Sequence, residues 1–132
     1  MARRPESQVI HLDTHIVCWL YEGRAELLSA AARGAIERGR LFVSPVVELE
    51  LQLLHEIGRI LKGPDAVLHA LTQEIGMQVT TTEYRGIVTA ARALGWTRDP
   101  FDRLIVADAM LTGARLITKD RLIRAHCPAA LW

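Results

Sequence analysis

Short β-like apolar runs alternate along the chain with longer segments in which apolar residues recur at helical spacing. The short runs predict strands at residues 9–12, 41–43, 77–80, 115–118 and 130–132. The longer segments predict helices at residues 16–21, 26–38, 46–60, 66–75, 83–94 and 102–112. Gly39, Gly76, Gly95 and Gly113 fall where these helices are expected to end.

Strands separated by helices predict an α/β fold, with a central parallel sheet of four to five strands flanked by helices. The connecting pieces are short and no repeat is present, so residues 9–132 are expected to form a single domain behind a flexible N-terminal leader, residues 1–8. In an open parallel sheet, the functional crevice lies beyond the carboxyl ends of the strands. The residues that follow each strand are therefore the first candidates for a site.

The amino-acid composition excludes several classes of protein. The chain has 132 residues, half of them hydrophobic, and 16 Lys and Arg against 15 Asp and Glu give a net charge of +1. These values argue against a disordered chain and against a strongly basic nucleic-acid arm. Cys18 and Cys127 are isolated, and no apolar run approaches the about 18–20 residues needed to cross a membrane. Without a signal peptide either, the expected location is the cytoplasm.

Aspartates follow or precede several of the predicted strands. Asp13 follows the first strand, Asp120 follows the fourth by way of Thr118, and Asp99 with Asp102 opens the helix before the fourth. Each has a structural alternative, because aspartate is a favoured residue at a helix N-terminus. Asp102 is harder to explain in this way, since a cap at Asp99 already satisfies the first free amides. The group is stronger support for a site than any member.

Glu50 is predicted to lie on an apolar helix face. With Ser44 as the cap and a turn of about 100° per residue, Glu50 falls inside the stripe expected to face the core, formed by Val46, Leu49, Leu53, Ile57 and Ile60. Glu48 points to the opposite side. A buried carboxylate must be protonated, paired or bound to a cation. An ion pair with an arginine and an edge position near solvent stay open as alternatives for Glu50.

Carboxylates that converge on one crevice repel one another, and this raises their pKa values until a divalent cation neutralises them. Oxygen ligands without histidine or cysteine suit Mg²⁺ or Mn²⁺ better than zinc. Such ions activate water and stabilise charge on phosphoryl oxygens. Phosphodiester hydrolysis is the chemistry that this set of acids favours.

The order and context of these acids resemble a known family, the PIN-domain ribonucleases, and within it the VapC-type toxins of bacterial toxin–antitoxin pairs. The resemblance covers residues 9–132. It is carried by the segments Val9-Ile10-His11-Leu12-Asp13-Thr14-His15, Val43-Ser44-Pro45 with Glu50, Asp99-Pro100-Phe101-Asp102-Arg103-Leu104-Ile105-Val106-Ala107 and Leu116-Ile117-Thr118-Lys119-Asp120. The closing Leu131-Trp132 is also similar to the end of that family.

The resemblance implies an endoribonuclease of PIN-like fold that depends on Mg²⁺ or Mn²⁺, forms a homodimer and is neutralised by a VapB-type antitoxin. It implies a catalytic and metal-holding set of Asp13, Glu50, Asp102 and Asp120. Asp99 is a second-tier carboxylate of the Asp-Pro-Phe-Asp-Arg subgroup. Relatives often carry tryptophan at the position before Glu50, where this chain has Leu49, so the choice of Glu50 over Glu48 rests partly on the helix face.

Residues beside the acids are candidates for lesser roles. The hydroxyl of Thr118 is expected to bond a ligand carboxylate or the attacking water, unless it is an ordinary strand residue. Arg103, Lys119 and Arg121 are candidates to bind phosphates of the RNA substrate, with charge balance inside the acid cluster or solvated surface as the alternatives. Trp19 is expected in the core or at a partner contact, because the chain has too few aromatic residues to favour a base-stacking surface.

Two other classes of protein compete with the nuclease. A receiver-like phosphoacceptor domain also has an aspartate after its first strand, but it carries paired acids there and an acceptor aspartate after a middle strand. Here Asp13 stands alone after the first strand, and the second and third strands are followed by no aspartate. A catalytically inactive PIN-like binding module is the third possibility, and the complete set of acids argues against it.

Overall fold

The computed structural model describes residues 8–132, so the predicted leader lies, apart from Gln8, outside the described residues. Five parallel strands form one sheet in the order β3-β2-β1-β4-β5. The strands are β1 (Val9–Leu12), β2 (Arg40–Val43), β3 (Gln78–Val79), β4 (Arg115–Ile117) and β5 (Ala130–Leu131). The predicted α/β class and parallel sheet are confirmed, with β3 and β5 shorter than the sequence indicated.

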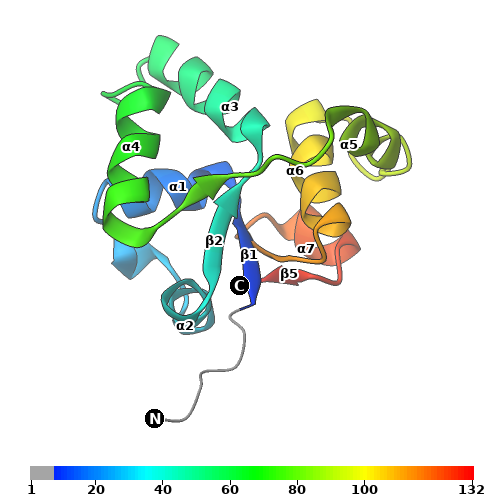
Figure 1. Ribbon diagram of the computed structural model, residues 1–132, viewed down its shortest axis with the longest axis horizontal. Helices are drawn as coiled ribbons and strands as arrows, with labels where there is room; N and C mark the ends of the chain where they lie inside the picture. The colour runs from blue at the N-terminus through cyan, green and yellow to red at the C-terminus, as the bar shows by residue number, and fades with distance from the viewer. Residues whose placement is uncertain (1–7) are drawn as a thin grey trace.

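Seven helices and one 3₁₀ turn cover this sheet (Figure 1). They are α1 (Thr14–Tyr21), the turn η1 (Ala25–Leu27), α2 (Ala30–Arg38), α3 (Pro45–Glu56), α4 (Pro64–Ile75), α5 (Tyr84–Ala91), α6 (Pro100–Leu111) and α7 (Arg121–His126). In Figure 1, α1, α2 and α4 lie on one side of the sheet and α5, α6 and α7 on the other. Helix α3 packs against both α4 and α6 and so joins the two layers at the top of the view.

The strand order reverses at β1. The chain runs outward from β1 through β2 to β3 and then returns to place β4 on the other side of β1. The carboxyl ends of β1 and β4 therefore diverge into connections on opposite faces of the sheet, which is where open α/β sheets form their crevices. In register, Leu12 pairs with Ile117, so the residues that follow these two strands start side by side.

Apolar strand residues make the centre of the core. Both faces of β1 and β4 are covered, and Ile10, Leu12, Leu116 and Ile117 are all at most 1% exposed. Burial on both faces explains why these strands read as continuous apolar runs in the sequence. Helices add further buried side chains to the same cluster, among them Val17, Val47, Ile105 and Ile123.

Three predicted helices were wrong in extent, and α3 is the third of them. The helix expected at 26–38 is the turn η1 followed by α2, because the Ser29 hydroxyl accepts a hydrogen bond from Ala32 N at 3.0 Å and begins a new helix. The helix expected at 83–94 ends at Ala91, before Gly95. Gly76 does end α4, with φ of 70°, a left-handed conformation that glycine adopts without steric cost.

Helix α3 buries a different face from the predicted one. Val47 and Leu51 are the fully buried residues, whereas Leu49 is 53% exposed and Ile57 is 68% exposed. The helix also ends at Glu56 and not at residue 60, and Gly58 follows with φ of 77°. The apolar stripe through Leu49 therefore lies at the surface, so the prediction that this stripe faces the core was wrong. Among the described residues, no helix is long and apolar enough to span a membrane.

Candidate active site

Asp13 lies at the carboxyl end of the central strand and caps α1. Its main-chain N–H donates to Ile117 O at 3.1 Å, which extends the pairing of β1 with β4 by one residue. Its carboxylate accepts from Thr14 N at 2.8 Å through Oδ1 and from the Thr118 hydroxyl at 2.6 Å through Oδ2. With Asp13 only 5% exposed, these bonds fix its carboxylate in one orientation.

Thr118 links the ends of the two strands. Its fully buried hydroxyl donates to Asp13 and accepts from Asp120 N at 3.0 Å. Asp120 in turn caps α7, since its Oδ1 accepts from Ile123 N at 2.9 Å. The helix that begins after Asp120 continues to His126. Sequence reasoning named Thr118 as a bonding partner of an acid, and the hydrogen bond to Asp13 confirms that contact.

Glu50 reaches the same edge of the sheet from α3. Its carboxylate accepts a hydrogen bond from the hydroxyl of Thr14, the first residue of α1. Glu50 is half-buried, and Glu48 on the opposite side of the helix is exposed. The structure therefore brings Glu50 to the predicted cluster. The apolar stripe that was expected to bury it lies at the surface, and within residues 8–132 no arginine forms an ion pair with it. Thr14, which sequence reasoning missed, is the residue that connects Glu50 to the end of β1.

Asp99 and Asp102 enter from the start of α6. Asp99 is exposed and caps the helix, its Oδ1 accepting from Phe101 N at 2.9 Å and from Asp102 N at 3.3 Å, so the predicted cap is confirmed. Asp102 lies in the first turn, is half-buried and uses its side chain in no hydrogen bond among residues 8–132. Helix capping explains why an aspartate stands at position 99. It does not explain the aspartate at position 102.

Electrostatics show which acids share one space. The pKa of Asp102 is raised to about 7. Burial is the largest cause, and the charges of four neighbouring acids add to it, namely Asp99, Asp13, Asp120 and Glu50. Burial also raises the pKa of Asp13, against the hydrogen bonds from Thr118 and Thr14. For Glu50 burial is again the largest cause of a raised pKa, with Asp13 and Asp99 adding to it. The four other acids therefore all lie close enough to Asp102 to act on its charge.

No Lys or Arg within residues 8–132 forms an ion pair with these acids. In the described part of the chain, the only ion pair joins Arg24 to Glu26, and it involves none of them. A group of carboxylates with uncompensated charge fits a hard divalent cation in its donor chemistry. No three His, Cys, Asp or Glu side chains within residues 8–132 stand close enough to hold one ion as arranged. The carboxylates would therefore have to move together on binding an ion.

The basic candidates lie in different surroundings. Arg103 donates from Nε to Thr97 O at 2.8 Å and from Nη1 to Ala91 O at 3.5 Å, so it holds the loop before α6 to the end of α5. Lys119 and Arg121 are exposed, and both flank Asp120. One alternative for Arg103 was that it balances charge inside the acid cluster. The structure does not show this, since its guanidinium donates to main-chain carbonyls.

A second buried acid escaped the sequence reasoning. Asp108 on α6 is fully buried and accepts from the hydroxyls of Thr80 at 2.5 Å and Thr82 at 2.6 Å. These bonds join α6 to the segment that follows β3. Like Glu50, Asp108 is a carboxylate among apolar residues of a predicted helix, and it stands between Ala107 and Ala109. The same signal could therefore have identified it from the sequence. Its partners identify it as a structural anchor outside the acid cluster.

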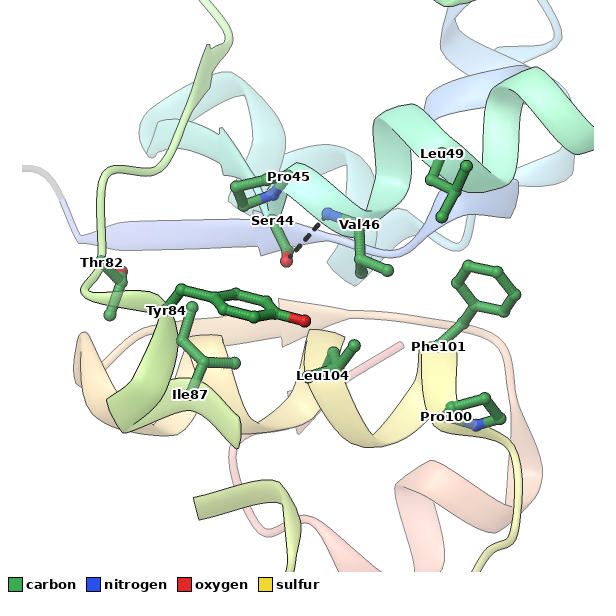
Figure 2. Close-up of a pocket in the computed structure, with 10 residues that line it drawn as sticks. All are labelled: Ser44, Pro45, Val46, Leu49, Thr82, Tyr84, Ile87, Pro100, Phe101 and Leu104. Carbon is green, nitrogen blue, oxygen red and sulfur yellow. Dashed lines mark hydrogen bonds between the residues drawn. The ribbon is translucent and has the colours of Figure 1, made fainter. Parts of the chain in front are cut away.

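An apolar cleft opens beside the acids, between α3 and α6 (Figure 2). Its volume is about 450 Å³. The residues that line it are Ser44, Pro45, Val46, Leu49, Thr82, Tyr84, Ile87, Pro100, Phe101 and Leu104. Figure 2 shows the Tyr84 ring lying between the two helices and the Phe101 ring pointing toward α3. None of the five acids lines the cleft, but Leu49 directly precedes Glu50 and Phe101 directly precedes Asp102 in the sequence.

A five-stranded parallel sheet with acids collected where the strand order reverses defines an α/β protein of the PIN-like class. A family model described as PIN domain matches residues 10–127, and the chain belongs to this family. It is 34% identical over 128 residues to Ribonuclease VapC22 of Mycobacterium tuberculosis, with 92% of this chain and 96% of that protein covered, so it is a VapC-type member. Membership sets aside the receiver-like alternative.

Solved structures share the fold. A toxin–antitoxin complex from Klebsiella pneumoniae matches with a TM-score of 0.68 at 21% identity, over 93% of this chain and 96% of that one. VapBC-1 from nontypeable Haemophilus influenzae gives 0.64 at 18% identity, over 95% and 96%. VapBC2 from Rickettsia felis, bound to a DNA fragment from their promoter, gives 0.58 at 18% identity, over 94% and 96%.

Proposed function

We propose that the protein is an endoribonuclease that depends on Mg²⁺ or Mn²⁺ and acts as the toxin of a VapBC-type module. The relative named as a ribonuclease and the PIN-domain match support this activity. The observation that carries the metal dependence is Asp102, whose pKa is raised to about 7 by burial and by four neighbouring acids. A divalent cation from solution would relieve that charge, and no Lys or Arg within residues 8–132 forms an ion pair with these acids.

Each acid has a role in this proposal. The ion would be held by four carboxylates, those of Asp13, Glu50, Asp102 and Asp120. When bound, it would act as a Lewis acid that lowers the pKa of water and stabilises charge on phosphoryl oxygens. Thr118 keeps Asp13 oriented, and Thr14 does the same for Glu50. Asp102 would have to be ionised to hold the ion, so metal binding would depend on pH. Asp99 holds the start of α6 and adds negative charge.

Cleavage of RNA by purified protein tests the activity. With Mg²⁺ or Mn²⁺ present, the wild-type protein is expected to cut single-stranded RNA, and Asp13→Asn and Asp102→Asn are expected to abolish cutting. Each asparagine keeps the size of the side chain but loses a carboxylate ligand. If Asp13→Asn cut RNA as fast as the wild type, the proposed site would be wrong. If the wild type bound Mn²⁺ in calorimetry but cut no RNA, an inactive PIN-like module would replace the nuclease.

We further propose that a VapB-type antitoxin is the partner and that an apolar segment of it fills the cleft between α3 and α6. The structural neighbours named as toxin–antitoxin complexes support a partner of this kind. The cleft supports the position, because it is apolar and two of its lining residues, Leu49 and Phe101, directly precede Glu50 and Asp102. A segment seated there would cover the acids and so block the substrate.

A homodimer is proposed from the family resemblance and from the exposed apolar residues of the α3 region. Leu53 is 39% exposed, Ile57 is 68% exposed and Leu61, in the loop after the helix, is 92% exposed. Burial of such residues against a second copy would remove their apolar surface from water. Light scattering is expected to give a dimer for the wild type and a monomer for Ile57→Glu. The proposed compartment is the cytoplasm, where the free thiols Cys18 and Cys127 stay reduced.

A further inference from the structure

Two tryptophans from opposite ends of the chain meet beside the acid cluster. Trp19 on α1 and Trp132 after β5 have ring centroids 6.1 Å apart and planes inclined by 57°. The ammonium of Lys119 lies 5.9 Å from the centroid of each ring. The ring of His15 lies 6.4 Å from that of Trp19. Aromatic and cationic groups thus gather at one place that no short stretch of sequence contains.

This cluster adjoins the proposed catalytic acids on two sides. Lys119 is the residue between Thr118, whose hydroxyl bonds Asp13, and Asp120. His15 acts electrostatically on both Asp13 and Glu50. A molecule that reached the acids from this side would pass over the tryptophans first.

The surroundings of Lys119 leave its charge available. Within residues 8–132 its ammonium forms no ion pair, although it lies next to Asp120 in sequence. Instead it lies near the limit of about 6 Å at which an ammonium interacts with an aromatic face. Two indoles therefore hold the ammonium beside the acids without neutralising it. An anion that approaches the site finds a lysine that is positioned and unpaired.

Single-stranded RNA is the ligand whose chemistry fits both parts of the cluster. Its bases stack on aromatic side chains without requiring a defined sequence, and its phosphates bind lysine. Trp19 and Trp132 are half-buried, so each is anchored in the core and still reaches solvent. The third tryptophan, Trp96, stacks on His126 at 5.1 Å and lines a pocket near the start of β4, the opposite end of that strand from Thr118.

We propose that Trp19, Lys119 and Trp132 form a nucleotide subsite that holds RNA next to the bond to be cut. Lys119 binds a phosphate that flanks the scissile one, and the two indoles hold its ammonium in place and stack on the adjoining base. The proposal rests on the ribonuclease function above and adds a substrate-binding surface to it. The enzyme is thereby expected to favour unpaired RNA, because a base in a duplex cannot reach the indoles.

Binding measured without cleavage tests the subsite. In an Asp102→Asn background with Mg²⁺ present, the affinity for a fluorescein-labelled single-stranded RNA is measured by anisotropy at several salt concentrations. Lys119→Met is expected to weaken binding about tenfold and to make the salt dependence shallower by about 0.7, the contribution of one phosphate contact in a single strand. Lys119 is exposed, so this variant is expected to fold normally.

The tryptophans are tested by the same assay and by their own fluorescence. Trp132→Leu and Trp19→Leu are expected to weaken binding about tenfold, in the range of one lost base stack, and Trp132→Phe is expected to restore most of the loss. The matched control is Trp96→Phe, which keeps the affinity and also keeps the quenching of fluorescence by RNA, since the two remaining tryptophans cause it.

The outcomes separate this proposal from the function on which it rests. If the wild type cuts RNA while Lys119→Met binds with unchanged affinity and salt dependence, the subsite is wrong and the nuclease stands. RNA that quenched only Trp96 would also overturn the subsite. If the wild-type protein neither bound nor cut RNA, the ribonuclease function would fail and the subsite with it.

Discussion

At the scale of single residues, the Thr118 hydroxyl has the largest structural task in the acid cluster. It is fully buried, donates to Asp13 Oδ2 and accepts from Asp120 N. Thr118→Val keeps the shape of the side chain and removes both bonds. We expect RNA cleavage to fall about 10–100-fold, as for other residues that orient metal ligands, and the free energy of unfolding to fall by about 1–3 kcal/mol. Denaturant unfolding and initial cleavage rates measure the two effects.

Two companion variants make this result specific. Thr118→Ser keeps the hydroxyl and is expected to retain most of the cleavage activity. Thr72→Val removes another hydroxyl, which donates to Met77 O at 2.7 Å outside the acid cluster, and is expected to reduce stability without reducing the cleavage rate. Equal cleavage by Thr118→Val and wild type would show that Asp13 is oriented without Thr118.

Asp102 makes the stability of the metal-free protein depend on pH. In the folded protein its pKa is raised from 3.8 to about 7, whereas in the unfolded chain it has its ordinary value. The folded state therefore binds the proton more tightly, and the free energy of unfolding falls as the pH rises from about 4 to 7. Because asparagine carries no charge, the Tm of Asp102→Asn minus that of the wild type is expected to grow across this interval in EDTA and to level off above it.

Addition of Mn²⁺ reverses this difference. The ion binds the ionised carboxylates of the folded wild type, so it is expected to raise the wild-type Tm most at pH 7 and above and to raise that of Asp102→Asn much less. A Tm difference between the two proteins that did not change from pH 4 to 7 would contradict the raised pKa.

Glu50 lies near the other acids although the helix face predicted for it was wrong. The stripe through Leu49 and Leu53 was expected in the core, and the structure exposes both. The periodicity of apolar residues identifies an amphipathic helix but does not say whether its apolar face meets the core or a partner. Glu50 joins the cluster because Thr14 bonds its carboxylate, a contact across 36 residues that sequence spacing does not reveal.

At the scale of elements, the start of α6 combines a helix cap with part of the acid cluster. Asp99 supplies the cap and is the first of the neighbouring charges that raise the pKa of Asp102. Asparagine caps as well as aspartate but carries no charge. Asp99→Asn is therefore expected to keep the stability of the protein and to lower the pKa of Asp102, measured by NMR titration of the carboxyl carbon in metal-free protein.

Asp99→Ala and Asp65→Asn complete this comparison. The alanine variant loses the cap and is expected to be less stable by about 1 kcal/mol. Asp65 lies in the first turn of α4, outside the cluster, so its replacement is expected to leave the pKa of Asp102 unchanged. If Asp99→Asn left that pKa unchanged as well, the two carboxylates would not share one space.

Local signals predicted those elements whose ends are set by nearby residues. Ser44 with Pro45 and Asp99 with Pro100 mark the starts of α3 and α6 in the sequence, and the structure has caps at both. The division of the segment 26–38 into η1 and α2 was missed, because alanine-rich sequence favours a continuous helix and only the Ser29 cap interrupts it. The meeting of Trp19 and Trp132 depends on the place of β5 in the sheet, which no local pattern encodes.

At the scale of the whole molecule, the reversal of strand order at β1 brings several separate segments to one edge. Asp13 follows β1, Asp120 follows β4, and the start of α6 lies across the apolar cleft from Leu49 of α3 (Figure 2). The sequence predicted that acids after the strands would meet, because parallel strands all point the same way. It did not predict the cleft, whose walls belong to helices in different layers.

That arrangement predicts how the toxin would be silenced. Leu49 lines the cleft and is 53% exposed, whereas Leu122 on α7 is 45% exposed and lies outside it, so arginine at either position is expected to be tolerated by the fold. The partner to use is a purified VapB-type antitoxin that binds and inhibits the wild-type protein. Leu49→Arg is expected to weaken its binding at least about tenfold, since a charge would be buried in an apolar contact, whereas Leu122→Arg is expected to bind as the wild type does.

Inhibition of RNA cleavage decides whether the cleft is also the route of neutralisation. At partner concentrations that silence the wild type and Leu122→Arg, the Leu49→Arg protein is expected to keep cutting RNA, because the segment that would cover Glu50 and Asp102 no longer seats. Equal inhibition of all three proteins would place the antitoxin elsewhere on the surface. Weakened binding with full inhibition at saturating partner would require contacts at the acids themselves, so the two measurements together distinguish blocking through the cleft from direct occupation of the site.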